Sequence, residues 1–418
     1  MAASNWFPLS VRLAMAFLRH GCPVSAVCPK GHPMRFVPGI ATLHRYRGLR
    51  SLASLRRAIL VEQPDLIVPC DDVVVQQLHA LHRQEPTLRA LIERSLGQPA
   101  AFPIVASRAR LLSLAVELGI RVPRTHSVSS DADLTSWTDD AAVLKTDGSA
   151  GGEGVAIVRS QAQMVAAYHR LSKPLSAAMA VKRLLVNRNP LVLWSWWKGR
   201  GGPGPQVVIQ GFIHGRPANT MIACWQGKVL ASVTVEVLCS QGATGAATVV
   251  RLIWNDEIEH ASRKLAERLQ LSGFYGLDFM LEGDSTAAYL IEMNPRCTQL
   301  GHLEIADDGD LAGALLVALG NGHEAHSVAQ RDNAITGDTI AFFPQACLWN
   351  PRSPYLTHGH HDVPWEAPAL LRELLLEEWP YRQWPARLYH RLFPPDRKHE
   401  AQFQAANPAP EPRVTISQ

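Results

Sequence analysis

Two neighbouring stretches decide the fold, FYGLDFM at residues 274–280 and YLIEMNPR at residues 289–296. Both are rich in aromatic and branched apolar residues, which favour β-strands. The intervening EGDS at residues 282–285 is typical of a turn. We therefore predict a β-hairpin with strands at residues 274–281 and 287–294.

The predicted hairpin carries polar groups suited to a metal ion. Side chains alternate faces along a strand, so Glu292 and Asn294 share one face, which Asp278 on the partner strand can join. Two carboxylates and an amide oxygen suit Mg²⁺ bridged to phosphates, and Arg296 at the strand end suits a phosphate oxygen. An ordinary half-buried hairpin with salt bridges is the alternative. Acids in so apolar a setting need compensating charge, which a metal supplies.

A glycine-rich stretch lies upstream of the hairpin, KTDGSAGGEGV at residues 145–155. Lys145 ends a predicted strand, and four glycines precede the next strand. Glycines let backbone N–H groups converge on an anion, and the lysine adds a mobile positive charge. The stretch is not a Walker loop, because no Gly-Lys-Ser/Thr follows. On its own, this segment fits a flexible hairpin as well as a phosphate site.

The order of these features resembles the ATP-grasp superfamily between about residues 107 and 319. The closing Glu-Met-Asn-Pro-Arg is the most specific piece. The resemblance implies an α/β and α+β protein, in which an N-terminal parallel α/β domain precedes a two-subdomain ATP-grasp fold. We expect four parts: 1–105, the N-terminal α/β domain; 106–320, the ATP-grasp domain; 321–393, a C-terminal extension; and 394–418, a disordered tail.

The resemblance also implies roles for individual residues. Arg296 and Lys145 would be catalytic, and Asp278, Glu292 and Asn294 would hold the metal. The implied nucleotide contacts are Arg108, Lys145, Gly148, Ser149, Gly151, Gly152, Gly154, Lys182, Gln210, Gly211, Phe212 and Ile213. The last four resemble the linker that binds adenine, and Lys182 falls in a segment, 180–184, that we expect to be a strand.

Two positions depart from the superfamily pattern. Arg108 stands where a lysine is common, which keeps the charge but not the compact ammonium. Residues 215–219, GRPAN, lack the usual ribose-binding glutamate, so either Asn219 takes its place or ribose is bound differently. Together with residues 69–72 and 223–225, this segment resembles a group of bacterial ATP-grasp proteins, which implies the class and not the substrate.

Periodicity predicts the rest of the chain. Helices at 10–20, 52–63 and 71–82 alternate with strands at 24–28 and 65–69, which indicates a parallel sheet. Only residues 1–8 are available for a strand before the first helix, so either the start is incomplete or the first strand is short. The later predicted elements are helices at 108–118, 161–171, 257–269 and 310–319, strands at 142–145 and 155–158, and an antiparallel set at 206–212, 221–225 and 228–238. Gln226-Gly227 is predicted to form a two-residue turn between the last two strands. We interpret 194–205 as an irregular insertion, and periodicity is lost between 321 and 368.

Composition excludes several classes. The 418 residues are 47% hydrophobic and carry a net charge of only +4, with no Lys/Arg run, which argues against nucleic acid. Seven scattered cysteines without a C-x-x-C pair favour a reducing cytoplasm. No apolar stretch has the length of a membrane span. A homodimer is left open.

These features favour an ATP- and Mg²⁺-dependent ligase that forms a carbon–nitrogen bond, with Mn²⁺ as an alternative metal. A small-molecule carboxylate would become an acyl phosphate, which an amine, or a thiol, then attacks. Kinase-like phosphoryl transfer and a non-enzymatic ATP-binding module are the alternatives. Asp71 and Asp72 suit either a substrate amine or a helix cap, and the histidines at 358–361 suit a metal or a solvated loop.

Overall fold

The computed structural model describes residues 1–146, 154–186, 196, 205–242, 244–283, 285–305, 309–320, 335 and 337–393. The tail from residue 394, most of the insertion at 194–205 and the glycine loop at 147–153 lie outside the described residues. In the described part, no single helix is long and apolar enough to cross a membrane, although a sharply bent pair, Pro99–Val105 with Arg108–Glu117, meets the criteria of length and composition.

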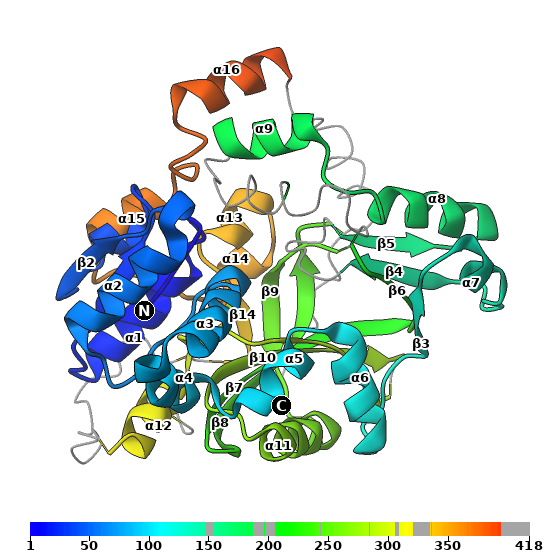
Figure 1. Cartoon of the computed structure of the whole chain (residues 1–418), viewed down its shortest axis with the longest axis horizontal. Coiled ribbons are helices and arrows are strands. Elements are labelled where there is room, and N and C mark those ends of the chain that lie inside the picture. Colours follow the sequence, from blue (N-terminus) through cyan, green and yellow to red (C-terminus); the bar gives the residue numbers. More distant parts are fainter. Residues whose placement is uncertain are drawn as a thin grey trace.

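The N-terminal part contains a small parallel sheet flanked by helices (Figure 1). Strand β1 (Ser25–Cys28) pairs in parallel with β2 (Thr42–Arg45). Ala2 bridges in parallel to both Val27 and Pro69, so residues 1–3 occupy the place of a short central strand. The predicted strand at 65–69 is wrong as a full strand, because its pairing is limited to that bridge. The surrounding helices are α1 (Leu9–Arg19), α2 (Ser51–Glu62), α3 (Asp72–Gln84) and α4 (Arg89–Leu96).

A four-stranded antiparallel sheet of order β3-β6-β4-β5 forms the next unit. Its strands are β3 (Thr125–Val128), β4 (Ala142–Thr146), β5 (Val155–Val158) and β6 (Val207–Gly211). Helices α7 (Asp131–Thr135) and α8 (Gln161–Leu171) cover one face, where Leu144 and Ile209 are buried with Met164. Because side chains alternate along β4, Lys145 points to the opposite, uncovered face.

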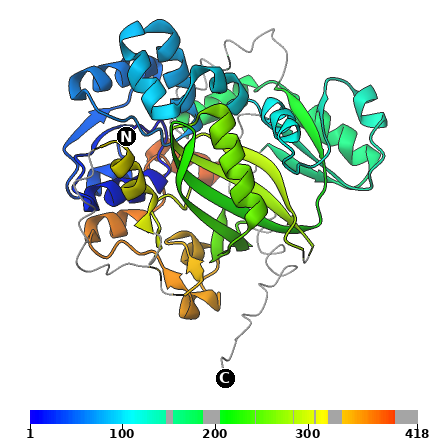
Figure 2. The ribbon, with the colours of Figure 1, turned by 90° about the horizontal axis from the view of Figure 1, so that it is seen from below.

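A seven-stranded sheet of order β11-β10-β7-β8-β9-β14-β15 forms the centre of the molecule (Figure 2). Its strands are β7 (Gly215–Trp225), β8 (Lys228–Ser240), β9 (Ala247–Leu252), β10 (Gly273–Glu282), β11 (Ala288–Asn294), β14 (Thr339–Ala341) and β15 (His360–His361). The predicted hairpin is confirmed as β10–β11. The predicted Gln226-Gly227 turn is also confirmed, and both of its residues have positive φ, 49° and 82°.

One grouping of strands was wrong. The segment at 206–212 was expected to join the strands at 221–225 and 228–238, but β6 belongs to the four-stranded sheet. Its apolar residues Val207 and Ile209 pack into the core beneath α8, whereas β7 begins only at Gly215. The short linker between β6 and β7 therefore crosses from one sheet to the other.

The two faces of the large sheet are covered by different helices. On one face, α6 (Arg108–Glu117) and α11 (Asp256–Leu269) bury Leu277 and Phe279. On the other face, α1 and α12 (Leu311–Ala318) bury Met221, and Phe17 meets Phe274 edge to face at 5.9 Å. Asp278, between two residues of the first face, therefore belongs to the second face.

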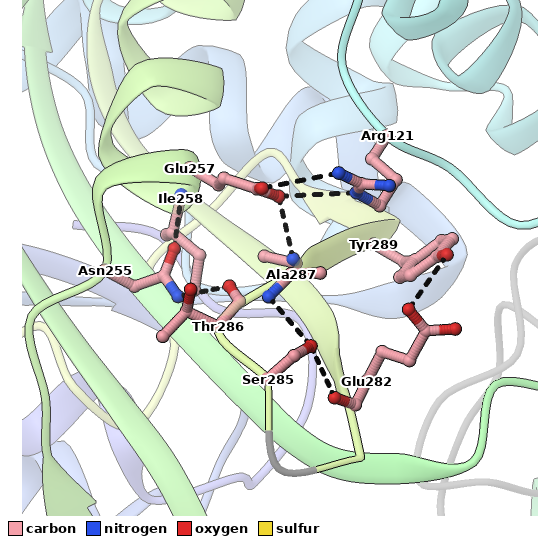
Figure 3. Close-up of polar contacts among 10 residues, drawn as sticks. Arg121, Asn255, Glu257, Ile258, Glu282, Ser285, Thr286, Ala287 and Tyr289 are labelled. Carbon is pink, nitrogen blue, oxygen red and sulfur yellow. Dashed lines mark hydrogen bonds and ion pairs between the residues drawn. The ribbon is translucent and has the colours of Figure 1, made fainter.

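The turn of the β10–β11 hairpin is anchored by the start of α11 (Figure 3). Asn255 caps this helix by accepting a hydrogen bond from the N–H of Ile258 at 3.0 Å, and its amide donates to the Thr286 carbonyl at 2.8 Å. Glu257 accepts from the N–H of Ala288 at 2.9 Å and pairs with Arg121 at 3.4 Å. These bonds fix where β11 starts, and hence where its acidic end lies.

The C-terminal residues form short elements, of which the sequence did not reveal β14, β15, α13 (Gln345–Trp349), α14 (Tyr355–His358) and α16 (Trp384–Leu392). Helix α15 (Pro368–Leu374) lies where periodicity returns in the sequence. Figure 1 shows α16 beside α9 (Ala177–Leu185), where the Lys182 ammonium lies 5.1 Å from the centre of the Tyr389 ring.

We predict that Asn255→Ala lowers the free energy of unfolding by about 1–2 kcal/mol, because it removes a helix cap and a buried hydrogen bond to the hairpin. Asn255→Asp keeps the cap and loses only the bond to Thr286, so its loss should be smaller. Urea unfolding of the three proteins measures this. If both variants unfold like the wild type, the anchoring role is wrong.

Candidate functional site

The predicted metal ligands meet on three adjacent strands of the large sheet. In the register, Asp278 of β10 lies opposite Glu292 of β11 on one side and opposite Asn219 of β7 on the other. Asn294 lies two positions along β11 from Glu292, opposite Gly276. Alternation therefore places all four side chains on the sheet face that carries the N-terminal part.

Asp278 accepts two amide hydrogen bonds and carries an unbalanced charge. Asn219 Nδ2 donates to its Oδ1 at 2.6 Å, and Asn294 Nδ2 donates to its Oδ2 at 3.2 Å. Water reaches the carboxylate, yet protein surrounds it on most sides. This desolvation, together with the negative charge of Glu292, raises the pKa of Asp278 to about 6. The pair of acids would be relieved by a cation between them.

Two cations lie close to these acids, Lys145 from the small sheet and Arg108 from the start of α6. Lys145 is only 8% exposed, and burial, followed by the neighbouring Arg108, lowers its pKa to about 8. Glu292 and Asp278 act in the opposite direction. Arg108 Nη2 pairs with Glu292 Oε1 at 2.8 Å, and its Nη1 donates to the Thr146 carbonyl at 3.4 Å. Because burial and Arg108 disfavour its charged form, Lys145 would be stabilised by a bound anion.

Arg296 connects this corner to the N-terminal part. Its Nε pairs with Asp72 Oδ1 at 3.1 Å, and its Nη2 donates to Asn294 Oδ1 at 3.4 Å. Desolvation opposes the charge of Arg296, but Asp72 and then Asp71 and Asp278 raise its pKa overall. The guanidinium is therefore charged and held next to the acidic face.

The donor set fits a magnesium ion with a bound polyphosphate. Two carboxylates and an amide provide hard oxygen ligands, and Lys145, Arg108 and Arg296 provide positive charge for phosphate oxygens. Within the described ranges, no group of three His, Cys, Asp or Glu side chains forms a separate metal site. An oxygen-rich corner with few protein ligands is typical of Mg²⁺ that is shared with substrate phosphates.

The linker between the sheets, which the resemblance assigns to adenine, uses two of its N–H groups within the protein. Gln210 is buried and its amide donates to Thr125 Oγ1 at 3.3 Å. The N–H of Gly211 donates to the Arg124 carbonyl at 2.9 Å, and that of Phe212 to the Ala141 carbonyl at 3.4 Å. Phe212 and Ile213 are half-buried, so they remain the apolar contacts of this prediction.

Other predicted nucleotide contacts fall elsewhere. Gly148, Ser149, Gly151 and Gly152 lie outside the described residues, while the Gly154 carbonyl accepts from the N–H of Thr146 at 3.0 Å. Lys182 is on helix α9, so the expected strand at 180–184 is wrong. Ser176 caps this helix, and alanine, lysine and leucine favour helix over strand. The structure gives Lys182 a contact with Tyr389 rather than with the acidic corner.

The remaining candidates have structural roles. Asp71 caps α3 through the N–H of Val74 at 3.0 Å and binds Ser4, as the capping interpretation predicted. His361 bonds to the Leu356 carbonyl, and Asp362 pairs with His302 at 2.8 Å, which leaves no histidine cluster for a metal in this described segment.

Two participants were not recognised in the sequence. Asp72 was considered only for a substrate amine or a cap, but it pairs with Arg296. Asn219 was considered for ribose, but it holds Asp278. A strand register would have identified Asn219, because it lies directly opposite Asp278. Asp72 depends on a contact between distant parts of the chain, which local patterns do not contain.

Comparison with known proteins agrees with the resemblance to ATP-grasp proteins. A family model described as an ATP-grasp domain matches residues 193–299. The N5-carboxyaminoimidazole ribonucleotide synthetase of Thermus thermophilus is similar in structure, with a TM-score of 0.54, 19% identity, and coverage of 76% of this chain and 78% of that chain. No curated protein sequence matches the chain.

Two further solved structures are similar, each with a TM-score of 0.54 and 14% identity. The match to carboxyaminoimidazole ribonucleotide synthase of Aspergillus clavatus, complexed with ATP, extends over 79% of this chain and 79% of that chain. The biotin carboxylase domain of the Hydrogenobacter thermophilus 2-oxoglutarate carboxylase, in complex with MgADP, ADP and bicarbonate, covers 76% of this chain and 69% of that chain. The resemblance to the ATP-grasp superfamily and the predicted fold class are therefore confirmed.

We predict that Asp278→Asn stabilises the protein by about 1–2 kcal/mol at pH 8 in the absence of nucleotide and divalent metal. The folded-state pKa of Asp278, about 6, is above the ordinary aspartate value of 3.8, so stability is lost as pH rises from about 4 through 6. The variant lacks this penalty, and its advantage should shrink at pH 5. Urea unfolding at the two pH values tests this, and an equal difference at both would contradict it.

Proposed function

We propose that the chain is an ATP- and Mg²⁺-dependent ligase, which activates a small-molecule carboxylate as an acyl phosphate for attack by an amine or a thiol. One observation carries the proposal: the buried cations Lys145 and Arg108 lie next to the carboxylates of Asp278 and Glu292 on the large sheet. Negative and positive side chains so close together suit a metal ion bound to phosphate, because the metal is a cation and the phosphate is an anion. The similar structures with bound ATP or MgADP support the choice of nucleotide.

Each residue of the corner has a distinct part in this proposal. Asp278, Glu292 and Asn294 would hold the magnesium, which neutralises charge on the phosphates when bound. Lys145 and Arg108 would lie against phosphate oxygens, and Arg296 would steady the transferred phosphoryl group. Such catalysis rests on positioning and charge neutralisation, so a protein nucleophile is not required.

The reaction would then need two substrates. The carboxylate oxygen attacks the γ-phosphorus, giving an acyl phosphate and ADP, and the amine displaces inorganic phosphate with loss of a proton. Bicarbonate, present in one of the similar structures, belongs in the set of acids to test. The positions of the acid and amine are not given by the metal corner itself.

We predict that ADP and phosphate release with Mg·ATP is stimulated by a member of a pooled panel of carboxylic acids, bicarbonate and amines. Glu292→Gln should lower this rate by roughly two powers of ten, because a metal ligand and the partner of Arg108 are both lost. Glu282→Gln is the matched control, since Glu282 lies at the turn end of the same hairpin. Coupled assays of both products give the rates.

The products separate the alternatives. A stable phosphorylated compound without free phosphate would identify kinase-like transfer. Binding of Mg·ATP without stimulated turnover would favour a binding module. Loss of activity in Glu282→Gln equal to that in Glu292→Gln would mean that the hairpin fold, and not the acidic corner, is being measured.

We predict a bell-shaped pH dependence of kcat/KM for ATP. Rates should fall below about pH 6, where Asp278 becomes protonated, and above about pH 8, where Lys145 loses its charge. Lys145→Arg keeps its charge at all these pH values, so the alkaline decline should move upward in that variant. An unchanged alkaline decline in Lys145→Arg would assign it to another group.

A further inference from the structure

The C-terminal part closes a cavity of about 260 Å³ over the N-terminal sheet. Trp6 and Phe7, from the loop after residues 1–3, form one wall, and residues 373–379 form another. The rings of Trp6 and Trp379 stack with centres 6.1 Å apart. Trp379 also lies directly on Gly31, where a Cβ atom would come within 2.3 Å of the ring. The absence of a side chain at Gly31 thus lets the C-terminal part seat here.

The cavity lies at the edge where parallel sheets bind ligands, outside the carboxyl ends of the strands. Residues 6–8 follow the short central strand, and Pro33 follows β1. Asp72, which pairs with Arg296, follows the bridge at Pro69 at this same edge. Gln299 lines the cavity and comes three residues after Arg296. The cavity therefore adjoins the segment that carries the proposed phosphoryl-binding arginine.

The main chamber is acidic. Glu373, Glu377 and Glu378 line it, and its described lining residues include no lysine, arginine or histidine. Arg382 pairs with Glu373 and neutralises it. The Glu378 side chain is exposed, and partial desolvation by the protein around it raises its pKa. A lining that combines carboxylates and tryptophan rings, with no basic side chain among its described residues, is suited to an organic ammonium group.

The inner end of the same region carries hydrogen-bond donors instead. A second cavity, of about 10 Å³ and hence about the size of one water, continues from the chamber. The residues that line both are Pro8, Gln299, Pro344, Gln345 and Leu374. Arg12 and the buried Asp362 also line this inner end, where the carboxylate of Asp362 offsets the charge of Arg12. Gln299 lines both cavities, and its Nε2 is buried without a hydrogen-bond partner. An unpaired buried donor at the end of the chamber is suited to an acceptor such as a ligand carboxylate.

We propose that this cavity binds a small zwitterion of the amino-acid class. Its carboxylate would accept from Gln299, its amino group would lie at Glu378, and Trp6 and Trp379 would cover its apolar part. The assignment of this zwitterion as the amine substrate rests on the proposed ligase function, whereas its binding does not.

The test uses thermal shift and calorimetry of the full chain with each of the twenty standard amino acids, with and without Mg·ADP. We expect at least one amino acid to bind and to raise the Tm. Its methyl ester lacks the carboxylate and its N-acetyl derivative lacks the ammonium, so both should bind at least about tenfold more weakly. Binding of either derivative as tightly as the parent, or of no amino acid, would overturn the proposal.

Variants locate the site. Glu378→Gln and Gln299→Leu should each weaken the binding of that amino acid by about tenfold or more. Gln299→Leu removes an unpaired buried donor, so its Tm without ligand should not fall. Glu267→Gln, at an exposed position on α11, is the matched control and should bind like the wild type. Unchanged affinity in both cavity variants would place the amino acid elsewhere.

The experiment also separates this inference from the proposed function. If an amino acid binds with this pattern but Mg·ATP does not bind, the cavity assignment stands and the ligase proposal fails. If Mg·ATP turnover is found but no amino acid binds, the ligase proposal stands and the cavity assignment fails.

Discussion

The structure depends on two carboxylates, Asp278 and Glu292, that lie opposite each other on adjacent strands, where protein desolvates Asp278. Like charges in such a setting raise each other's free energy unless cations surround them. Three cations surround them: Lys145 from the small sheet, Arg108 from the start of α6, and Arg296 from the end of β11. Separate parts of the chain thus provide the positive charge that these carboxylates need.

The architecture explains why such a balance is achieved with so few residues. The strand period of two buries Leu277 and Phe279 under α6 and α11, while Asp278 between them faces the opposite side. The same apolar core that stabilises the sheet therefore places the carboxylate of Asp278 on the opposite face. Desolvation disfavours the charged forms of Asp278 and Lys145. A metal ion at the carboxylate and a phosphate at the lysine would stabilise both charges.

Much of this could be predicted from the sequence, because the decisive signals are local. The hairpin, the Gln226-Gly227 turn and the shared face of Glu292 and Asn294 follow from alternation and turn chemistry. The assignment of β6 to a separate sheet, the Asp72–Arg296 pair and the Asn219–Asp278 bond do not, because each depends on which distant segments pack together. Lys182 shows a further limit, since the segment around it was expected to be a strand although its cap and composition favour a helix.

The most direct test of the account is a crystal structure of the full chain with Mn²⁺ and ADP, measured at a wavelength where manganese gives an anomalous signal. The account predicts one strong manganese peak within coordination distance of Asp278 and Glu292, with the phosphates toward Lys145 and the adenine at the linker between the two sheets. A metal bound away from these carboxylates, or nucleotide on another face of the large sheet, would contradict it.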